Sequence, residues 1–435
     1  MKRPTQAAGT PRQPNSRPAA DAGADRAYVG RDEALALLDV KAATLYTYVS
    51  RGLIRRVATP GRRQSLYARE DVERIRARSN ARSTDAVLAA GSIRYGEPIV
   101  PTSITELGSD GPKYRGRSAV ELARSGIRFE RVAELLWTGL LLDAGPWTLD
   151  ALPERLVRLA RRPSELGTPI GIHDAFAFVT LAAAMADGAP RSRVTDSASP
   201  ATTARRLILV LTGCFGFLAR PGRYRPPRAG ESVAAAIAAS LGLAATERNL
   251  RVLDAALILC ADHELNPATF VARIGASSES DLHACIASAI CASSGARIAR
   301  ACDRLEEFFR GEVSAEALAP GHSALAPSGF NHPLYPAGDP RGRCLLALVR
   351  EHAGRSARVR AILAALDTAE QRHRQQPRIE TALAVAAIAL SLPPGAAAGL
   401  YTLGRVAGWA AHIAEQRLGG FLIRPRAKFV GVAGG

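Results

Sequence analysis

The strongest constraint on the fold is a helical sequence pattern that runs almost without interruption from about residue 90 to the C-terminus. Ala and Leu dominate the chain, and aromatic residues make up only 5% of it. This composition favours helices, because Ala and Leu lose little entropy in a helix whereas strands prefer β-branched and aromatic residues. We therefore predict a mainly α-helical fold, with few strands beyond a short segment near Ile93–Ile99. Pro- and Gly-rich breaks divide the pattern into many helices, at Pro146, Pro153, Pro190, Pro221–Pro227, Pro320–Pro340 and Pro393–Gly395.

The formal net charge is +17, and nearly all of the positive charge comes from Arg. A positive balance of this size attracts phosphate-bearing partners, such as nucleic acid or a phosphorylated cofactor. An Ala- and Arg-rich sequence can equally reflect coding bias, so the net charge alone does not establish that the protein has a binding surface for phosphate groups.

The six cysteines show no CxxC pair and no clustering with His. Most lie in apolar runs, which predicts buried, reduced thiols and no metal site. The N-terminus lacks the apolar core of a secretory signal, and the longest apolar runs fall short of the ~20 residues that span a bilayer. These features predict a soluble, cytoplasmic protein that does not contact a membrane.

Residues 1–26 are rich in Pro, Arg, Ala and Gln without apolar periodicity, which predicts a disordered tail. Residues 27–79 predict a compact unit of helix, turn, helix, two-strand hairpin around Pro60-Gly61, and a third helix. This order resembles the winged helix-turn-helix domains of the MerR/excisionase type.

That resemblance implies that the second helix of the unit enters a DNA groove and that the wing contacts phosphates. The helix then offers Lys41, Thr44 and Tyr46, and the wing offers Arg55, Arg56, Arg62 and Arg63. A domain that keeps this fold for protein–protein contact is the alternative, because acidic residues offset part of the basic charge.

Four segments of the remaining chain carry recognisable motifs. The first is "YRG" at residues 114–116, which is followed by apolar residues at helical spacing. The second is "ADHELNPATF" at residues 261–270, where Asn266-Pro267 predicts a helix start directly after His263. A His at such a position can donate to an anionic ligand, and the helix dipole adds to the attraction.

The third segment is "GFNHPLYPAGDPR" at residues 329–341, a turn-rich stretch that contains His332 and Arg341. Loops of this kind seldom form part of a hydrophobic core and often carry binding or catalytic residues. The fourth segment is the C-terminal run that contains Arg405 and Arg424. A dicarboxylate needs several fixed cations, and Arg supplies bidentate contacts that are always charged. Helix packing is the expected role of Trp409 and His412 in the same run.

Together these segments resemble the citrate synthase family over about residues 90–435. The resemblance implies that residues 80–435 form a citrate synthase-like multi-helical domain. Its large subdomain would comprise about residues 90–295 and 393–435, its small mobile subdomain about residues 296–392, and the protein would be a homodimer.

In the family, the His at the position of His263 binds a carboxylate of oxaloacetate, and the His at the position of His332 polarises its carbonyl. Arginines at the positions of Arg341, Arg405 and Arg424 bind carboxylates, the last one in the site of the other subunit. The resemblance implies oxaloacetate and an acyl-CoA as ligands, with acetyl-CoA as co-substrate and no permanently bound cofactor.

The sequence departs from the family pattern at the groups that handle protons. The stretch "SSGARIARACDRL" at residues 293–305 has Ile298 where the family has the His that steadies the enol oxygen. Loss of such a donor costs roughly 10²–10³ in rate. Glu380 stands where the family has its Asp base, and Asn331 where it usually has Gly.

Two functions follow as hypotheses. The first is an acyltransferase that condenses acetyl-CoA, or another short acyl-CoA, with oxaloacetate, with activity weakened or lost because of Ile298. His332 and Glu380 would be its catalytic residues. The alternative is a catalytically inactive regulator that senses a carboxylate or a CoA ester and binds DNA.

Overall fold

The computed structural model describes residues 28–50, 54, 56–58, 65–69, 71–73, 75–76, 100–142, 145–147, 152–166, 168–186, 200–295, 299–311, 313–320, 329–352 and 356–425. They fall into two compact units, one before residue 100 and one from Val100 onward. The two units are described separately below.

The described part of the N-terminal unit contains two helices, a small sheet and further helical residues at 69, 71–73 and 75–76. Helix α2 spans Arg31–Leu38 and helix α3 spans Ala42–Ser50. Strands β1 (Tyr28–Val29), β2 (Arg56–Ala58) and β3 (Ser65–Ala68) pair antiparallel in the order β1-β3-β2. One small apolar core holds the unit together, formed by Val29, Ala34, Leu38, Leu45, Ile54, Tyr67, Val72 and Ile75. The assignment of this unit to a winged helix-turn-helix stays a prediction.

The larger unit begins with an antiparallel sheet that the sequence analysis missed. Strands β4 (Thr105–Gly108), β5 (Gly111–Tyr114) and β6 (Arg117–Ser118) follow one another in the sheet. Each strand has four residues or fewer, and Gly and Pro within them conceal the alternation that marks a strand. The strand predicted near Ile93–Ile99 lies outside the described residues.

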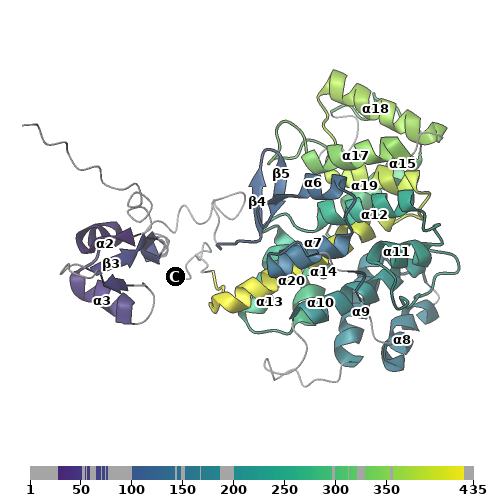
Figure 1. Ribbon diagram of the computed structural model, residues 1–435. Coiled ribbons are helices and arrows are strands. Elements are labelled where there is room, and N and C mark those ends of the chain that lie inside the picture. The colour runs from purple at the N-terminus through teal and green to yellow at the C-terminus, as the bar shows by residue number, and fades with distance from the viewer. Residues whose placement is uncertain are drawn as a thin grey trace, which may run out of the picture. The chain divides into compact units, whose positions relative to one another are not determined.

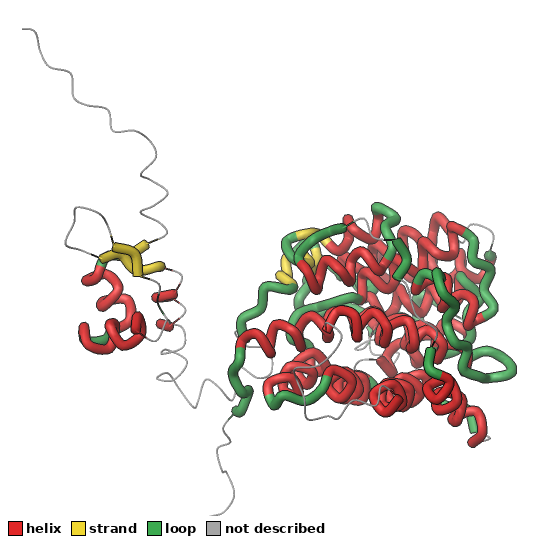
Figure 2. Tube along the Cα trace, turned by 60° about the horizontal axis from the view of Figure 1, so that its bottom comes forward, coloured by secondary structure: helices red, strands yellow, loops and turns green. Residues whose placement is uncertain are grey.

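Helices form nearly all of the rest of this unit (Figure 2). Their bounds are α6 (Ala119–Arg124), α7 (Phe129–Thr138), α8 (Glu154–Arg161), α9 (Ile172–Ala186), α10 (Pro200–Thr212), α11 (Val233–Leu241), α12 (Glu247–Cys260), α13 (Pro267–Ser277), α14 (Leu282–Ser293), α15 (Ala299–Arg310), α17 (Pro340–His352), α18 (Ala357–His373), α19 (Ile379–Ala389) and α20 (Ala396–Gly419), with 3₁₀ helices η1 (Arg162–Leu166) and η2 (Gly213–Phe217). The prediction of a mainly helical protein is confirmed.

Helix α20 organises the packing of the larger unit. It contacts α12, α13, α10, α15 and α19, so that it touches elements from both ends of the unit. Helices α15, α17, α18 and α19 gather at one end, and α8, α9, α10 and α11 lie toward the other (Figure 1). Twenty-four residues long and buried along most of its length, α20 fixes the relative positions of side chains from distant parts of the sequence.

Two glycines let α20 approach α12 and the segment after it closely. A Cβ on Gly404 would lie 2.8 Å from the carbonyl oxygen of Leu257, and one on Gly408 would lie 2.4 Å from that of Ala261. The amide of Gly408 donates to the Ala261 carbonyl at 3.0 Å. This contact sets the depth at which Arg405, between the two glycines in the sequence, enters the interior.

Five of the six cysteines are buried as predicted, and Cys291 is exposed. All six are free thiols. Among the described residues, none of the helices combines the length and apolarity needed to cross a membrane.

Replacement of Gly408 by Val is expected to destabilise the protein by about 1–3 kcal/mol, because its side chain would collide with backbone that cannot give way. The measurement is urea unfolding followed by circular dichroism. Gly145→Ala serves as the control, since a Cβ there meets nothing within 4 Å. Equal stability of the two variants would contradict the close-contact account.

Candidate functional site

His263 is held in a short connection between α12 and α13. The predicted helix start is confirmed: Asn266 caps α13 by accepting from the amide of Thr269 at 2.9 Å, and Pro267 opens the helix. On the other side, the Tyr114 hydroxyl donates to the Ile258 carbonyl at 2.9 Å and lies 3.2 Å from the amide of Asp262. The backbone around His263 is therefore fixed from both sides.

The loop that carries His332 is closed by an asparagine in a left-handed conformation. Asn331 has φ of 53°, a region that Gly and Asn tolerate better than other residues. Its side chain donates to Gln375 Oε1 at 3.0 Å and accepts from the Gln376 amide at 3.0 Å. The departure from Gly at this position thus preserves the turn and adds side-chain contacts.

His263, His332 and Tyr335 form one cluster of rings. His263 Nε2 lies 2.9 Å from the Tyr335 hydroxyl, and the two imidazole centroids are 5.3 Å apart. Burial, followed by the charges of Arg341 and Arg405, lowers the pKa of His263 well below its usual value. Burial and the charge of Arg341 also lower the pKa of His332, to about 3. Both imidazoles are therefore neutral at physiological pH.

Arg341 is paired within the protein. Its Nε and Nη2 atoms donate to the two carboxylate oxygens of Asp339 at 3.0 and 2.8 Å. Burial opposes the charge of Asp339, but the Arg341 charge and the Ile379 amide more than offset it, so the pKa of Asp339 is lowered. The pair positions the guanidinium, whose carbon lies 5.8 Å from the Tyr335 ring centroid.

Arg405 is a buried cation with spare donors. Its residue is 1% exposed, and its Nε and Nη1 atoms have no hydrogen-bond partner within the described part of the chain. Its Nη2 atom reaches the Tyr401 hydroxyl at 3.4 Å, and its guanidinium stacks over the Tyr401 ring at 5.2 Å. Unsatisfied buried donors are costly, which makes this group a candidate for binding an anion.

Glu380 lies in the first turn of α19 and is 7% exposed. Its Oε2 atom accepts no hydrogen bond from the described residues, and the nearest ion-pair partner recorded for it is Arg378, whose Nε lies 3.8 Å away. That separation is beyond hydrogen-bond range, so the carboxylate oxygen keeps its lone pairs available.

The electrostatic couplings place the charged groups within one region. The charges of Arg341, Arg405 and Arg378 all contribute to lowering the pKa values of His263 and His332, in addition to burial. Contacts through the Tyr335 ring join His263, His332 and Arg341, and the charges of Glu380 and Arg405 act on Arg341 and His263.

The described residues do not join two other predicted positions to this cluster. Arg424 is exposed in the segment after α20, and no contact joins it to the cluster within the described residues. Ile298 lies outside the described residues. Cys302, four residues later, is fully buried, and burial, followed by the charge of Glu380, raises the pKa of its thiol.

The predicted DNA-contacting residues are only partly described. Lys41 is exposed directly before α3. On α3 itself, Tyr46 is exposed and Thr44 is half-buried, and Arg56 is exposed on β2. Arg55, Arg62 and Arg63 lie outside the described residues.

Sequence reasoning missed several residues that shape the cluster. Tyr335 and Asp339 stand inside the quoted third segment, but nothing in their spacing distinguishes them from loop residues. Tyr401 lies four residues before Arg405, a spacing that places both on one helix face. Arg378 precedes α19, and its role emerges only from the fold.

A second network of hydrogen bonds and ion pairs joins the segment that carries His263 to α13 and α20. His412 Nε2 lies 3.2 Å from Asp262 Oδ2, and its Nδ1 lies 3.1 Å from Arg273. Arg273 also pairs with Glu415 at 2.9 Å. This network anchors the residue before His263 to α20 and supports the structural role predicted for His412.

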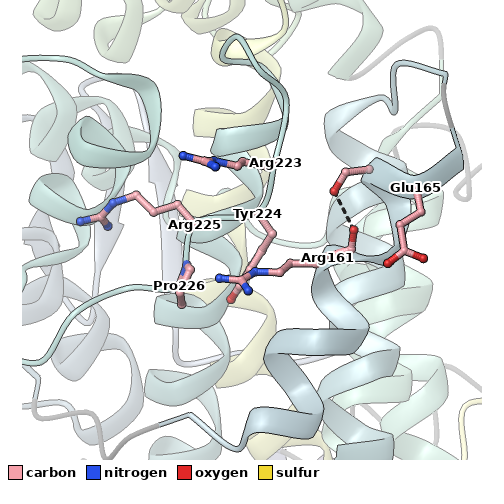
Figure 3. A pocket seen from close by; sticks show the side chains of 7 residues that line it. Arg161, Glu165, Arg223, Tyr224, Arg225 and Pro226 are labelled. Carbon is pink, nitrogen blue, oxygen red and sulfur yellow. Dashed lines mark hydrogen bonds between the residues drawn. The ribbon is translucent and has the colours of Figure 1, made fainter.

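Two cavities, of about 540 and 720 Å³, are lined by none of the predicted site residues. One of about 540 Å³ lies between α8 and residues 223–226, away from the predicted residues (Figure 3). Figure 3 shows Arg161 extending toward Tyr224 and Pro226, whereas Arg225 points away from Arg161. Arg225 is bound to Glu231 through two contacts of 3.0 and 2.7 Å. Across the described ranges, no group of three or more His, Cys, Asp or Glu residues is placed to hold a metal ion.

The family model for the citrate synthase C-terminal domain matches residues 95–426. The chain belongs to the citrate synthase family. It is 29% identical to a citrate synthase of Haloferax volcanii over 346 residues, covering 73% of this chain and 89% of the relative. It is also 29% identical to a 2-methylcitrate synthase of Shewanella oneidensis over 204 residues, 44% of this chain and 53% of the relative.

Relatives from Mycobacterium at 33% identity match over 52% of their own length, so the chain spans about half the length of these curated relatives. The fold is also that of a solved citrate synthase from Thermoplasma acidophilum, determined in ternary complex with carboxymethyl coenzyme A and oxaloacetate. The TM-score is 0.68 at 19% identity, over 81% of this chain and 98% of that one.

His263 provides a pH-dependent test of the cluster. A folded-state pKa below 6.5 means that the unfolded chain binds the proton more tightly, so the contribution of His263 to stability is lost as the pH falls below about 6.5. The difference in unfolding free energy between wild type and His263→Gln should therefore shift by up to about 1.4 kcal/mol per pH unit between pH 6.5 and 5.

Urea unfolding of both proteins across this range measures that difference. The subtraction removes groups that titrate in the opposite sense, such as Glu306, whose pKa burial raises to about 7. A pH-independent difference would contradict the neutral, buried imidazole.

Proposed function

We propose that this protein condenses a short acyl-CoA, in the first instance acetyl-CoA, with oxaloacetate. The single observation that carries the proposal is Arg405, a buried guanidinium with two spare donors beside Arg341 and two neutral imidazoles. A small dicarboxylate supplies the acceptors that these donors lack, and Arg binds carboxylates with strong, charge-assisted hydrogen bonds.

The neutral state of the histidines suits the ketone between the two carboxylates. A neutral imidazole can donate one N–H to the carbonyl oxygen, which draws electrons from the carbon under attack. His332 serves this role in the proposal, and His263 binds a carboxylate. Glu380, a buried carboxylate with an oxygen that accepts no described hydrogen bond, is the base for the acyl-CoA α-proton.

The relatives support the assignment at the level of reaction class. Their names include citrate synthases and a 2-methylcitrate synthase, and the Thermoplasma structure holds a CoA analogue together with oxaloacetate. In the proposal, acetyl-CoA enters as co-substrate, and no cofactor is permanently bound. The activity is weaker than in the relatives, because Ile298 cannot donate a hydrogen bond.

Arg405→Gln is expected to weaken oxaloacetate binding by 30-fold or more, since truncating one partner of a buried charged contact costs about 2–5 kcal/mol. Isothermal titration calorimetry measures the change. Arg350→Gln is the matched control, because Arg350 pairs with Asp367 at the surface. Equal affinities in the two variants would contradict the role of Arg405.

Turnover is tested by thiol release from acetyl-CoA or propionyl-CoA in the presence of oxaloacetate. Wild type is expected to release thiol faster than Glu380→Ala by about 10² or more, because a positioned base contributes roughly 10²–10⁴. If wild type is no faster than Glu380→Ala while oxaloacetate still binds, the protein is not a condensing enzyme.

A homodimer is part of the proposal. Phe178, Leu181 and Met185 stand three to four residues apart on α9 with 38%, 43% and 52% exposure, which gives one helix an outward apolar stripe. A second copy of the chain would cover it and could bring its Arg424 to the site. Light scattering should show a dimer in wild type and a monomer in Phe178→Glu, whereas a monomeric wild type would contradict the dimer.

The alternative function is a DNA-binding regulator whose larger unit senses a carboxylate or a CoA ester. Exposed Lys41, Tyr46 and Arg56 in the N-terminal unit favour it. DNA retardation in the presence and absence of oxaloacetate tests it, with Lys41→Ala/Arg56→Ala expected to weaken DNA binding. Wild type that binds neither DNA nor carboxylate would reject this function.

A further inference from the structure

The removal of an α-proton from a thioester requires two groups, and only one of them has been assigned so far. A base takes the proton, and a donor stabilises the negative charge that develops on the thioester oxygen. Without that donor the enolate forms slowly. Position 298 supplies an isoleucine, and the sequence contains no His between His283 and His322.

We propose that Arg378 is this donor: its guanidinium hydrogen-bonds the enolate oxygen while Glu380 holds the α-proton. The inference rests on the proposed function. Among the described residues, Arg378 is the cation recorded within 4 Å of Glu380, with Nε 3.8 Å from Oε2.

The spacing suits a thioester that lies alongside the two side chains. The methyl carbon and the carbonyl oxygen of an acetyl group are about 2.4 Å apart, as follows from C–C and C=O bond lengths of about 1.5 and 1.2 Å. Two groups 3.8 Å apart can therefore contact both ends of this fragment, one at the methyl and the other at the oxygen. Glu380 is not hydrogen-bonded by Arg378 at 3.8 Å, so its oxygen can still accept a proton.

The backbone fixes Arg378 at this place independently of its side chain. Its amide donates to the Gly329 carbonyl at 2.9 Å, and its carbonyl lies 2.9 Å from the position that a Cβ on Gly342 would occupy. Arg378 is the residue before α19, and its side chain makes no capping hydrogen bond there. A substitution can thus change the guanidinium without removing these backbone contacts.

Other cations near the site are engaged differently. Arg341 is held by both oxygens of Asp339, and Arg405 stacks over Tyr401 on α20. The side chain of Arg378 is 17% exposed, so it lies at the edge of the buried cluster, and because its Nε atom is covered, a second substrate would contact the terminal nitrogens of the guanidinium. Its charge also acts on His332 and His263, which places it beside the proposed oxaloacetate site.

The step balances without a further reactant. The methyl C–H bond breaks and its proton moves to Glu380 Oε2. The bonding pair becomes a C=C bond, and the C=O π pair moves to the oxygen as negative charge. Arg378 donates a hydrogen bond to that oxygen and keeps its proton. In D₂O the reverse step returns deuterium to the methyl group.

Deuterium incorporation into the methyl group of acetyl-CoA isolates this step. Malate, which has a hydroxyl in place of the ketone, occupies the dicarboxylate site without allowing condensation. Mass spectrometry then measures exchange for wild type, Arg378→Gln, Arg378→Lys, Glu380→Ala and the surface control Arg350→Gln. Thermal unfolding shows that each variant is folded.

Arg378→Gln is expected to slow exchange by roughly 10²–10³, while its affinity for oxaloacetate stays within about threefold of wild type by calorimetry. Arg378→Lys keeps the charge and should recover part of the rate. Glu380→Ala should abolish exchange, and Arg350→Gln should match wild type.

Three results would overturn the inference. Exchange in Arg378→Gln within threefold of wild type would show that Arg378 is not the donor, and would leave the proposed function intact. An equal loss of exchange and of oxaloacetate binding would make Arg378 a carboxylate-binding cation. Wild type that binds oxaloacetate but neither exchanges nor releases thiol would remove the proposed function together with this inference.

Discussion

A guanidinium group in a protein interior needs an anion, and Arg405 is the group on which this structure depends. Its depth is set by Gly404 and Gly408, which let α20 approach α12 and the residue after it within distances that any side chain would prevent. Asp339 pairs with Arg341 and both histidines are neutral, whereas Nε and Nη1 of Arg405 have no hydrogen-bond partner among the described residues. The arrangement is stable only if other interactions in the fold, or a bound anion, offset the free energy of burying donors that lack a hydrogen-bond partner.

Much of the fold could be predicted because its signals are local. Ala- and Leu-rich runs between Pro and Gly breaks became helices, and Asn266-Pro267 opens α13 with the expected cap. The motif segments contain His263, His332, Arg341, Glu380 and Arg405, whose charges and rings influence one another in the fold, and their roles in a site stay predictions. The choice of these residues came from the resemblance to a family, since spacing along the chain cannot show that residues more than a hundred positions apart share a site.

Features that depend on tertiary contacts were not visible in the sequence. The sheet of β4, β5 and β6 has strands too short to show an alternating pattern. Tyr335 and Asp339 gain their roles only when the loop folds against His263 and α19. Arg378 looks like an ordinary residue before a helix until its side chain is seen beside Glu380. Arg424, which the resemblance assigns to the site of the other subunit, is exposed after α20, and its role stays a prediction.

The most direct test of the central claim is a crystal structure of the protein with oxaloacetate bound. The account predicts one carboxylate within hydrogen-bond distance of Arg405 Nε or Nη1, the other at Arg341, and the ketone oxygen at His332. Oxaloacetate bound away from these side chains, or an ordered site in which Arg405 contacts no part of the ligand, would contradict it.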